Sequence, residues 1–348
     1  MLNSSKQDSY RSRVNGVAID IKGNKEGGIN MVKKKSTVLK ELIEREEILF
    51  RLNVAIALQA KMAEAIGFKA LGVSGAHTAA HIFGLPDAGL ITLTETVENV
   101  QRICNAVSIP VMADCDTGYG NAINVRRTVQ LIIQAGAAGL FIEDQVEPKR
   151  CGFVKGKELV SIEEAVGKFQ AAVDARNELD RDFIIMARTD ARTAVGGSLE
   201  ETIRRAKAYR EEASVDAIYV ESLQSRDEIK QVRAALDGPL ACSCQAIEPK
   251  PTLQELQEMG ICLTLGVMFF KVAYVAMWDM LAAMKQRGLD PWNEWSEKHK
   301  DHPMAEFGIF DLTGFPKIRE WEEKYLSPEQ LAKYDKSMGL YDPSGSRG

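Results

Sequence analysis

Charged side chains follow several short apolar runs of this sequence, each at the point where the run ends. They are Asp114 and Asp116, Glu143 and Asp144, Arg188 and Asp190, and Glu221. If the runs are parallel strands of a barrel, their carboxyl ends share one rim, where carboxylates repel one another unless a cation lies among them. Mg²⁺ binds one or two carboxylates together with water and substrate oxygens, so Asp114 and Asp116 are predicted to bind Mg²⁺. Taken singly, each carboxylate could instead cap the helix that follows it.

Two loops carry further groups that could do chemistry. Asp116–Gly120 is a turn whose glycines let the backbone approach a ligand closely. The loop Lys149-Arg150-Cys151-Gly152 places two cations beside a thiol. Neighbouring cations lower a thiol pKa, so Cys151 is a candidate acid, base or nucleophile, whereas the alternative is an inert buried cysteine.

Eight short apolar runs, each followed by a longer amphipathic stretch, are the elements that must position these groups. The runs are Ile48–Leu52, Ala70–Val73, Val111–Ala113, Leu140–Ile142, Phe183–Ala187, Ala217–Val220, Leu240–Cys242 and Leu263–Val267. Eight parallel strands with crossover helices predict an α/β fold of the (β/α)₈ TIM-barrel type. An open nucleotide-binding sheet is disfavoured because the glycine-rich fingerprint is missing after the first run.

Three segments follow from this pattern. Residues 1–35 are polar and lack periodicity, which predicts a disordered N-terminal tail. Residues 36–270 are predicted to form the barrel and catalytic domain. Residues 271–348 are predicted to form additional C-terminal helices, a segment too long to be only the eighth barrel helix and therefore expected to contact other subunits.

Composition excludes several classes of partner. The chain has 348 residues, 27% of them charged, and a formal net charge of −5, so it offers no basic field for nucleic acid. No apolar run reaches the roughly 20 residues of a membrane span, and the N-terminus lacks a signal-peptide core, which predicts a cytoplasmic protein. The six cysteines are expected to be reduced, and the one-residue gap between Cys242 and Cys244 does not suit a zinc knuckle.

Taken together, an ordered set of motifs resembles the isocitrate lyase and phosphoenolpyruvate mutase superfamily over residues of about 40 to 270. The motifs are Ser74-Gly75-Ala76, Leu85-Pro86-Asp87, Ala113–Asn121, Ile142-Glu143-Asp144-Gln145, Pro148-Lys149-Arg150-Cys151-Gly152 and Ala187–Ala191. The lysine-arginine-cysteine-glycine loop is similar to that of the branch containing methylisocitrate lyase, dimethylmalate lyase, oxaloacetate hydrolase and carboxyphosphonoenolpyruvate mutase.

This resemblance implies a role for each motif. Asp114 and Asp116 would hold Mg²⁺, with Asp87 and Glu143 around it; Arg188 and the turn Ser74-Gly75-Ala76 would hold the 2-oxo acid end of a small carboxylate substrate. Cys151 would protonate the departing carbanion, Glu221 would contact the substrate or orient its partners, and Gly152 and Ser243 would also line the substrate site. The resemblance further implies a tetramer in which the last helix is swapped between subunits.

Several positions depart from the family pattern. Phe153 replaces a histidine, Ala55 and Ile56 replace a tyrosine and an aspartate, and Ser243 replaces an asparagine. The eighth run reads Gly266-Val267-Met268-Phe269, and only Lys271 stands near a missing arginine. These changes fall on the side that binds the second half of the substrate, where unpaired carboxylates would be costly to bury. A smaller or more apolar leaving fragment than that of methylisocitrate is therefore expected.

Three functions are compatible with these residues. The favoured one is a Mg²⁺-dependent carbon–carbon lyase that cleaves a substituted 2-hydroxy di- or tricarboxylate to a 2-oxo acid and a carboxylate. The second is a phosphonomutase similar to carboxyphosphonoenolpyruvate mutase, and the third is a non-catalytic family member. Tyr119 is one candidate for the base that takes the hydroxyl proton, an assignment that the sequence does not fix.

Overall fold

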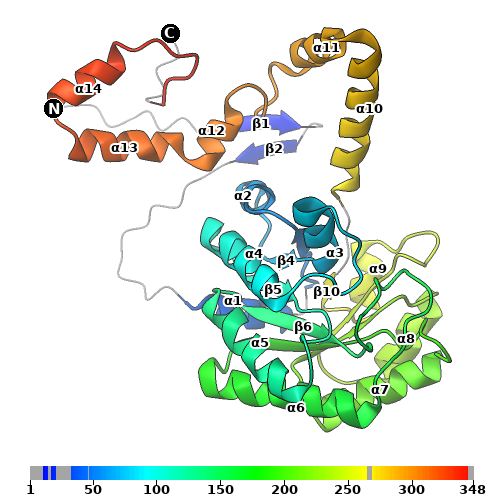
Figure 1. Cartoon of the computed structure of the whole chain (residues 1–348). Coiled ribbons are helices and arrows are strands. Elements are labelled where there is room, and N and C mark those ends of the chain that lie inside the picture. The colour runs from blue at the N-terminus through cyan, green and yellow to red at the C-terminus, as the bar shows by residue number, and fades with distance from the viewer. Residues whose placement is uncertain (1–10, 15–16, 21–32, 46, 265–268, 344–348) are drawn as a thin grey trace. The chain divides into compact units, whose positions relative to one another are not determined.

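The computed structural model describes residues 11–14, 17–20, 33–45, 47–264 and 269–343. The chain divides into two compact units (Figure 1), of which one comprises residues 28–268 and the other residues 1–27 together with residues 269–348. The larger unit holds every site residue expected from the sequence.

The larger unit is a barrel of eight parallel strands that pair in chain order. The strands are β3 Leu52–Val54, β4 Leu71–Val73, β5 Val111–Asp114, β6 Gly139–Glu143, β7 Ile184–Thr189, β8 Ala217–Val220, β9 Leu240–Cys242 and β10 Leu263–Thr264. The last strand returns to the first through Leu49, whose N–H donates to Cys262 O at 2.8 Å and whose carbonyl accepts from Thr264 N at 3.0 Å. The expected (β/α)₈ barrel is therefore confirmed.

The first and last strands differ from the expected bounds. The run expected at Ile48–Leu52 is not the first strand, which instead begins at Leu52, because Asn53 and Val54 are the residues that pair with β4. Leu49 contributes only an isolated bridge to Leu263. The described part of the last strand ends at Thr264, and residues 265–268 lie outside the described residues.

Helices connect consecutive strands around the barrel. In the larger unit they are α1 Lys35–Ile43, α2 Ala57–Ile66, α3 Gly75–Thr78, the π-helical turn η1 Ala79–Phe83, α4 Leu93–Ala106, α5 Ala122–Gln134, α6 Ile162–Leu179, α7 Leu199–Glu211, α8 Arg226–Ala235 and α9 Leu253–Glu258. Several begin where a serine or threonine accepts a hydrogen bond from the third residue of the helix, as Ser198 Oγ does from Glu201 N at 3.0 Å in α7.

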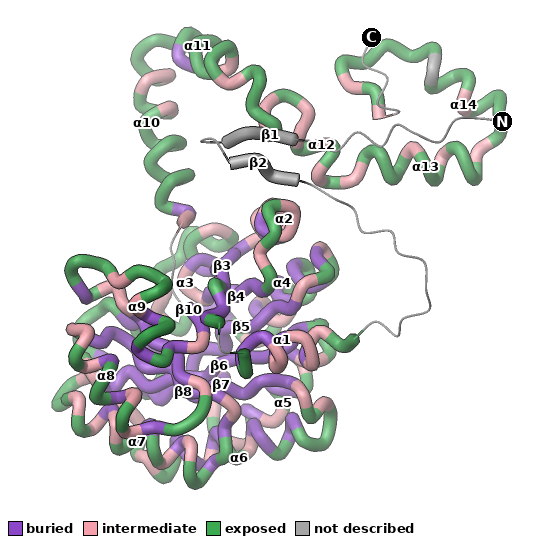
Figure 2. Tube along the Cα trace, turned by 180° about the vertical axis from the view of Figure 1, so that it is seen from behind, coloured by how far each residue is buried: buried purple, intermediate pink, exposed green. Residues whose placement is uncertain are grey.

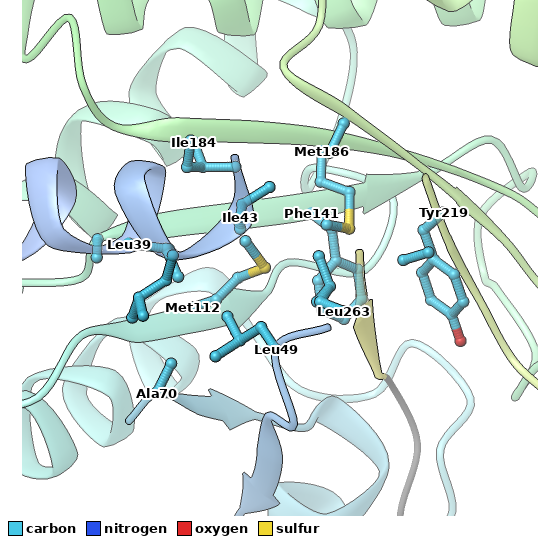
Figure 3. Packing of buried hydrophobic residues seen from close by; sticks show 14 residues of the cluster. Leu39, Ile43, Leu49, Ala70, Met112, Phe141, Ile184, Met186, Tyr219 and Leu263 are labelled. Carbon is cyan, nitrogen blue, oxygen red and sulfur yellow. The ribbon is translucent and has the colours of Figure 1, made fainter. Parts of the chain in front are cut away.

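Helix α1 packs against the core of the barrel. Its Leu39 and Ile43 are buried together with Ala70, Met112 and Ile184 (Figure 3). The strands are buried along their whole length (Figure 2), as expected for parallel strands with side chains inside the barrel and helices outside it. Since Ala70 directly precedes β4 and Ile184 begins β7, α1 closes the amino end of the strands, which leaves the carboxyl end for the site.

The smaller unit contains a hairpin and the C-terminal helices. Strands β1 Arg11–Val14 and β2 Val17–Asp20 pair antiparallel within the segment expected to lack regular structure; the other residues from 1 to 32 lie outside the described part. The helices are α10 Lys271–Arg287, α11 Asp290–His299, α12 Gly308–Thr313, α13 Phe315–Tyr325 and α14 Pro328–Asp335. Among the helices that the structure describes, not one combines the length and the apolar character that crossing a membrane requires.

Candidate active site

A buried lysine lies among carboxylates at the carboxyl end of β5 and β6. Lys149 Nζ is 2.5 Å from Asp87 Oδ1, 2.9 Å from Asp116 Oδ1 and 3.9 Å from Glu143 Oε1. Burial lowers the pKa of Lys149, but the surrounding carboxylates outweigh burial and raise the pKa well above its ordinary value. The ammonium therefore remains charged and neutralises part of the acidic cluster.

The turn at Ser74 and Gly75 faces the two aspartates expected to bind the metal. Gly75 N donates to Asp114 Oδ2 at 3.0 Å, and Asp116 N donates to Asp114 Oδ1 at 3.3 Å. A Cβ on Gly75 would lie 3.1 Å from Asp114 Oδ2 and 3.2 Å from Asp116 Oδ1. Because position 75 has no side chain, the space between the two carboxylates stays open, with Ser74 capping α3 beneath it and Ala76 inside that helix.

These donors fit Mg²⁺, although the described residues hold no group of three His, Cys, Asp or Glu side chains placed to bind one ion directly. Mg²⁺ needs only one or two carboxylates because it keeps several waters. Asp114 and Asp116 supply hard oxygen donors beside an open space, and Lys149 already marks a position that favours positive charge. Burial raises the pKa of Asp116 to about 6 against the opposing effect of Lys149, so the carboxyl is mostly ionised at neutral pH.

Arg188, at the end of β7, connects this acidic cluster to the next strand. Its Nε lies 2.8 Å from Asp190 Oδ2 and 3.1 Å from Glu143 Oε2, and its Nη2 lies 3.5 Å from Glu221 Oε2. Asp190 accepts a second bond from Arg188 Nη2 at 3.0 Å, which fixes the plane of the guanidinium. Tyr219 OH donates to Glu221 from below, so the position of Glu221 is also fixed.

The loop that carries Cys151 is held against Arg188 by a buried lysine. Lys157 Nζ donates to the Gly152 carbonyl, lies 3.1 Å from Asp190 Oδ1 and donates to Thr193 Oγ1 at 2.7 Å. A Cβ on Gly152 would lie only 2.7 Å from Arg188 Nη2, a distance that real Cβ contacts do not show. Glycine is therefore required at position 152 for the loop to approach the guanidinium.

Cys151 is half-buried beside Asp87, whose carbonyl accepts from Cys151 N at 3.1 Å. The expectation that neighbouring cations lower its pKa is wrong, because burial, with a smaller contribution from Asp87, raises the pKa of the Cys151 thiol to about 11. The Lys149 ammonium forms ion pairs with Asp87 and Asp116, so it lowers the pKa of the Cys151 thiol only slightly. A protonated thiol suits an acid better than a nucleophile.

The residues that depart from the family pattern form a different environment. Ser243 is fully buried, and its Oγ has no hydrogen-bond partner among the described residues. Ala55 is also fully buried, whereas Phe153 is 50% exposed. Ser243 N donates to Val220 O at 3.0 Å, which places it next to the strand end that carries Glu221. Gly266, Val267 and Met268 lie outside the described residues.

A cavity adjoins the acidic cluster on the side of α3 and α4. Its lining includes Pro86, Asp87, Asp114, Asp116 and Tyr119. Tyr119 OH shares a hydrogen bond of 2.7 Å with Thr96 Oγ1, and burial, with Asp116, raises the pKa of Tyr119 well above its ordinary value. Tyr119 therefore holds its proton firmly, which argues against it as a base.

Comparison with known proteins identifies the family to which this site belongs. Residues 39–285 match the phosphoenolpyruvate phosphomutase family. The chain belongs to this family. It is 38% identical to 2,3-dimethylmalate lyase of Eubacterium barkeri over 293 residues, which cover 83% of this chain and 97% of the relative.

Solved structures of family members superpose on the chain over most of its length. A 2,3-dimethylmalate lyase described as a PEP mutase/isocitrate lyase superfamily member gives a TM-score of 0.77 at 31% identity, covering 88% of this chain and 99% of that one. Phosphonopyruvate hydrolase in complex with oxalate and Mg²⁺ gives a TM-score of 0.74 at 31% identity, and the match covers 85% of this chain and 100% of that one. The resemblance and the enzyme class expected from the sequence, a lyase of the isocitrate lyase and PEP mutase superfamily, are confirmed.

Three buried groups of this phosphomutase-family barrel were not among the residues expected from the sequence. Lys157 holds the Cys151 loop, Tyr219 holds Glu221, and Arg51 lies inside the barrel with its Nη2 3.0 Å from Asn53 Oδ1. Lys157 stands in a loop of polar residues and gives no signal in the sequence. Arg51 does give one, since a cation within an apolar run that leads into a barrel strand is expected to be buried. Its burial lowers its pKa to about 10.

Proposed function

We propose that the protein is a Mg²⁺-dependent carbon–carbon lyase that cleaves a substituted 2-hydroxy dicarboxylate to a 2-oxo acid and a carboxylate. One arrangement supports this proposal above all others. One network of contacts joins three features of the site. They are the open space between Asp114 and Asp116, the guanidinium of Arg188, and the loop that carries the protonated thiol of Cys151. Such a network combines a cation site, an anion site and an acid, which are three of the groups that this cleavage needs.

Each site residue has its own role in the proposed reaction. Arg188, with the Ser74–Ala76 turn, binds the carboxylate of the 2-oxo acid half, and Mg²⁺ bound at Asp114 and Asp116 would stabilise negative charge on the reacting oxygen. When the substrate hydroxyl loses its proton to a base, its electrons form the new carbonyl, and the carbon–carbon bond electrons pass to the leaving fragment. Cys151 donates its thiol proton to the resulting carbanion. Glu221 holds the Arg188 guanidinium in position, and Gly152 lets the Cys151 loop lie close to that guanidinium.

The uncharged side of the rim supports a substrate with few carboxylates on its leaving fragment. Ser243, Ala55 and Ile56 offer no cation there, so a tricarboxylate such as methylisocitrate would bury a carboxylate without a partner. The leaving fragment of a dimethylmalate-like substrate carries a methyl group where that of methylisocitrate carries a second carboxylate arm. The similarity to 2,3-dimethylmalate lyase over 83% of the chain supports this choice.

The oligomer and surroundings of the enzyme are proposed as well. Helix α10 has no buried residue in the single chain, and its Val272 and Trp278 are each 75% exposed. Large apolar side chains that are exposed in a single chain are usually buried against another protein surface. This supports a homotetramer with the C-terminal helix swapped between subunits. A small carboxylate as substrate, and a cytoplasmic location, complete the proposal.

A phosphonomutase is the second candidate, and it is favoured by the family match and by the likeness to phosphonopyruvate hydrolase. A phosphonate substrate would not need the cationic partner that the second half of the rim lacks. Phosphorus NMR of the enzyme incubated with phosphoenolpyruvate or a phosphonopyruvate separates the two functions, because only a mutase converts a carbon–phosphorus bond to a phosphate ester or the reverse.

The deciding experiment follows 2-oxo acid release through a coupled dehydrogenase, with Mg²⁺ and a panel of 2-hydroxy di- and tricarboxylates. The lyase proposal expects release from dimethylmalate-like substrates that stops when the metal is chelated. Cys151→Ser should lower kcat by about 10²-fold, the lower end of what a general acid contributes, because serine is a much weaker acid than the thiol. Cys262→Ser, which changes a cysteine outside the site, is the matched control; methylisocitrate as the best substrate would contradict the substrate choice.

A further inference from the structure

Two cysteines at the end of β9 form a pair that has no role in the proposed lyase reaction. Cys242 is the last residue of the strand and is buried, and Cys244 follows two residues later and is half-buried. Their Sγ atoms lie 3.5 Å apart. The two thiols therefore contact each other directly, and one of them can be reached from solvent.

The backbone between the two cysteines is compatible with a bond between their sulfurs. Residues two apart cannot have Cα atoms more than about 7.6 Å from each other, and disulfides commonly span about 4.4 to 6.8 Å. A disulfide of about 2.05 Å requires the sulfurs to approach from their present contact distance, which rotation about the side-chain bonds with a small backbone shift supplies. The ring so closed would contain Ser243.

Disulfide formation needs one thiol that ionises readily to attack the oxidant, and the two cysteines differ in this respect. All six cysteines lie among the described residues, and Cys244 alone has a lowered pKa, because its hydrogen bond with the Cys242 thiol favours the thiolate. Burial and Glu221 oppose this effect, whereas Arg226 and Lys250 add to it. The same contact raises the pKa of Cys242 well above its ordinary value, so Cys242 keeps its proton while Cys244 is the more nucleophilic sulfur.

We propose that Cys242 and Cys244 are a modification site at which a peroxide forms a reversible intramolecular disulfide. The Cys244 thiolate attacks one peroxide oxygen, the oxygen–oxygen bond breaks, and the hydroxide that leaves takes up a proton to become water. The Cys242 sulfur then attacks the sulfenic acid on Cys244, a sulfur–sulfur bond forms, and hydroxide leaves with the Cys242 proton as a second water. Two thiols lose two electrons and the peroxide gains them; a dithiol reductant reverses the change.

The position of the pair distinguishes it from the other cysteines. Burial raises the pKa of Cys104 to about 12 and that of Cys262 to about 11. No sulfur–sulfur contact other than that of Cys242 with Cys244 is recorded among the described residues. Peroxide at low excess should therefore oxidise this pair first.

The test counts thiols in the full-length enzyme and needs no substrate, so its result does not depend on the proposed function. The protein is treated with a small excess of hydrogen peroxide, the peroxide is removed, and free thiols are measured after unfolding. The count should fall from six to four, a loss of two, and return to six with dithiothreitol. Cys242→Ser and Cys244→Ser should each fail to lose a pair, whereas the matched control Cys262→Ser should still lose two.

Peptide mapping locates the bond. Trypsin releases residues 234–271 with three cysteines on one peptide, and cyanogen bromide cleavage at Met259 separates Cys262 from the pair. A fragment that holds both Cys242 and Cys244 and is lighter by two hydrogens supports the proposal. A count that stays at six, or a bond that joins either residue to Cys262, overturns it.

Discussion

The two sides of the barrel mouth differ in the charge of their buried side chains. On the side of β5 to β7, buried acids and bases pair with several partners each, as Lys149 does with Asp87 and Asp116. On the side of β9 and the end of β3, the corresponding positions are small and uncharged, and the Ser243 hydroxyl has no partner among the described residues. The motifs on which the family resemblance was based lie on the charged side, and the uncharged side holds Ser243 and Ala55, where departures from the family pattern were expected.

This difference has a physical cause. A buried charge that loses its partner costs several kcal/mol, so each member of the charged network restricts what the others can become. Ser243 and Ala55 carry no charge, and replacing them leaves no ion unpaired. The chemistry common to the family can therefore remain fixed on one side while the other side adapts to a different leaving fragment.

The largest effect is expected from removing a carboxylate on the charged side. Asp114→Ala should lower kcat with the proposed substrate by about 10³-fold or more at saturating Mg²⁺, because the ion's contribution of several kcal/mol converts to that factor at about 1.4 kcal/mol per tenfold. Steady-state rates measure it. Asp227→Ala removes a carboxylate that is 84% exposed at the start of α8 and should change the rate less than about twofold; equal losses in both variants would show that the charged side has no special role.

A smaller effect is expected where the network holds a loop rather than a substrate. Lys157→Met should lower the free energy of unfolding by about 3 kcal/mol, at the lower end for a broken buried ion pair because Arg188 still pairs with Asp190. Urea unfolding measures the difference. Lys155, two residues away, is exposed, so Lys155→Met should cost less than about 0.5 kcal/mol. If the two variants unfold alike, Lys157 does not anchor the Gly152 carbonyl.

The smallest effect is expected at Phe153, an exposed residue of the loop that carries Cys151. Phe153→His restores a family residue at a position that is 50% exposed, so it should raise the ratio of kcat/KM for methylisocitrate to that for dimethylmalate by only about threefold, less than about 1 kcal/mol. Val154→His makes the same change at a neighbour of similar exposure and should leave the ratio unchanged. A shift of a hundredfold at position 153 would mean that this exposed position controls the choice of substrate as strongly as a buried one.

Much of the barrel and its rim could be predicted from the sequence, because both depend on a local pattern. An apolar run followed by a charged residue marks the carboxyl end of a strand, and in this way Asp114, Glu143 and Arg188 were expected on one rim, where the structure joins Glu143 and Arg188 at 3.1 Å. The bounds of β3 could not be predicted, since they depend on pairing with β4 rather than on the apolar character of Ile48 to Phe50.

Properties set by tertiary burial were not predictable. The pKa of Cys151 was expected to fall because two cations adjoin it in sequence, and it rises because the folded chain buries the thiol and gives the Lys149 ammonium to carboxylates. Lys157 likewise resembles any loop lysine until the fold brings Asp190 and Gly152 around it. Sequence neighbours and spatial neighbours differ most where charges are buried.

The closure of the barrel by α1 also bears on the order in which the chain folds. Ser36 Oγ donates to Asp180 Oδ2 at 2.7 Å across 144 residues of sequence, and Thr37 Oγ1 donates to Asp182 Oδ2 at 2.6 Å across 145. Contacts of such separation form late, because the intervening chain must be ordered first. Although α1 leaves the ribosome before any strand of the barrel, it can dock only after β7 has been made. Until then the amino end of the growing barrel exposes its apolar surface to chaperones and to other nascent chains.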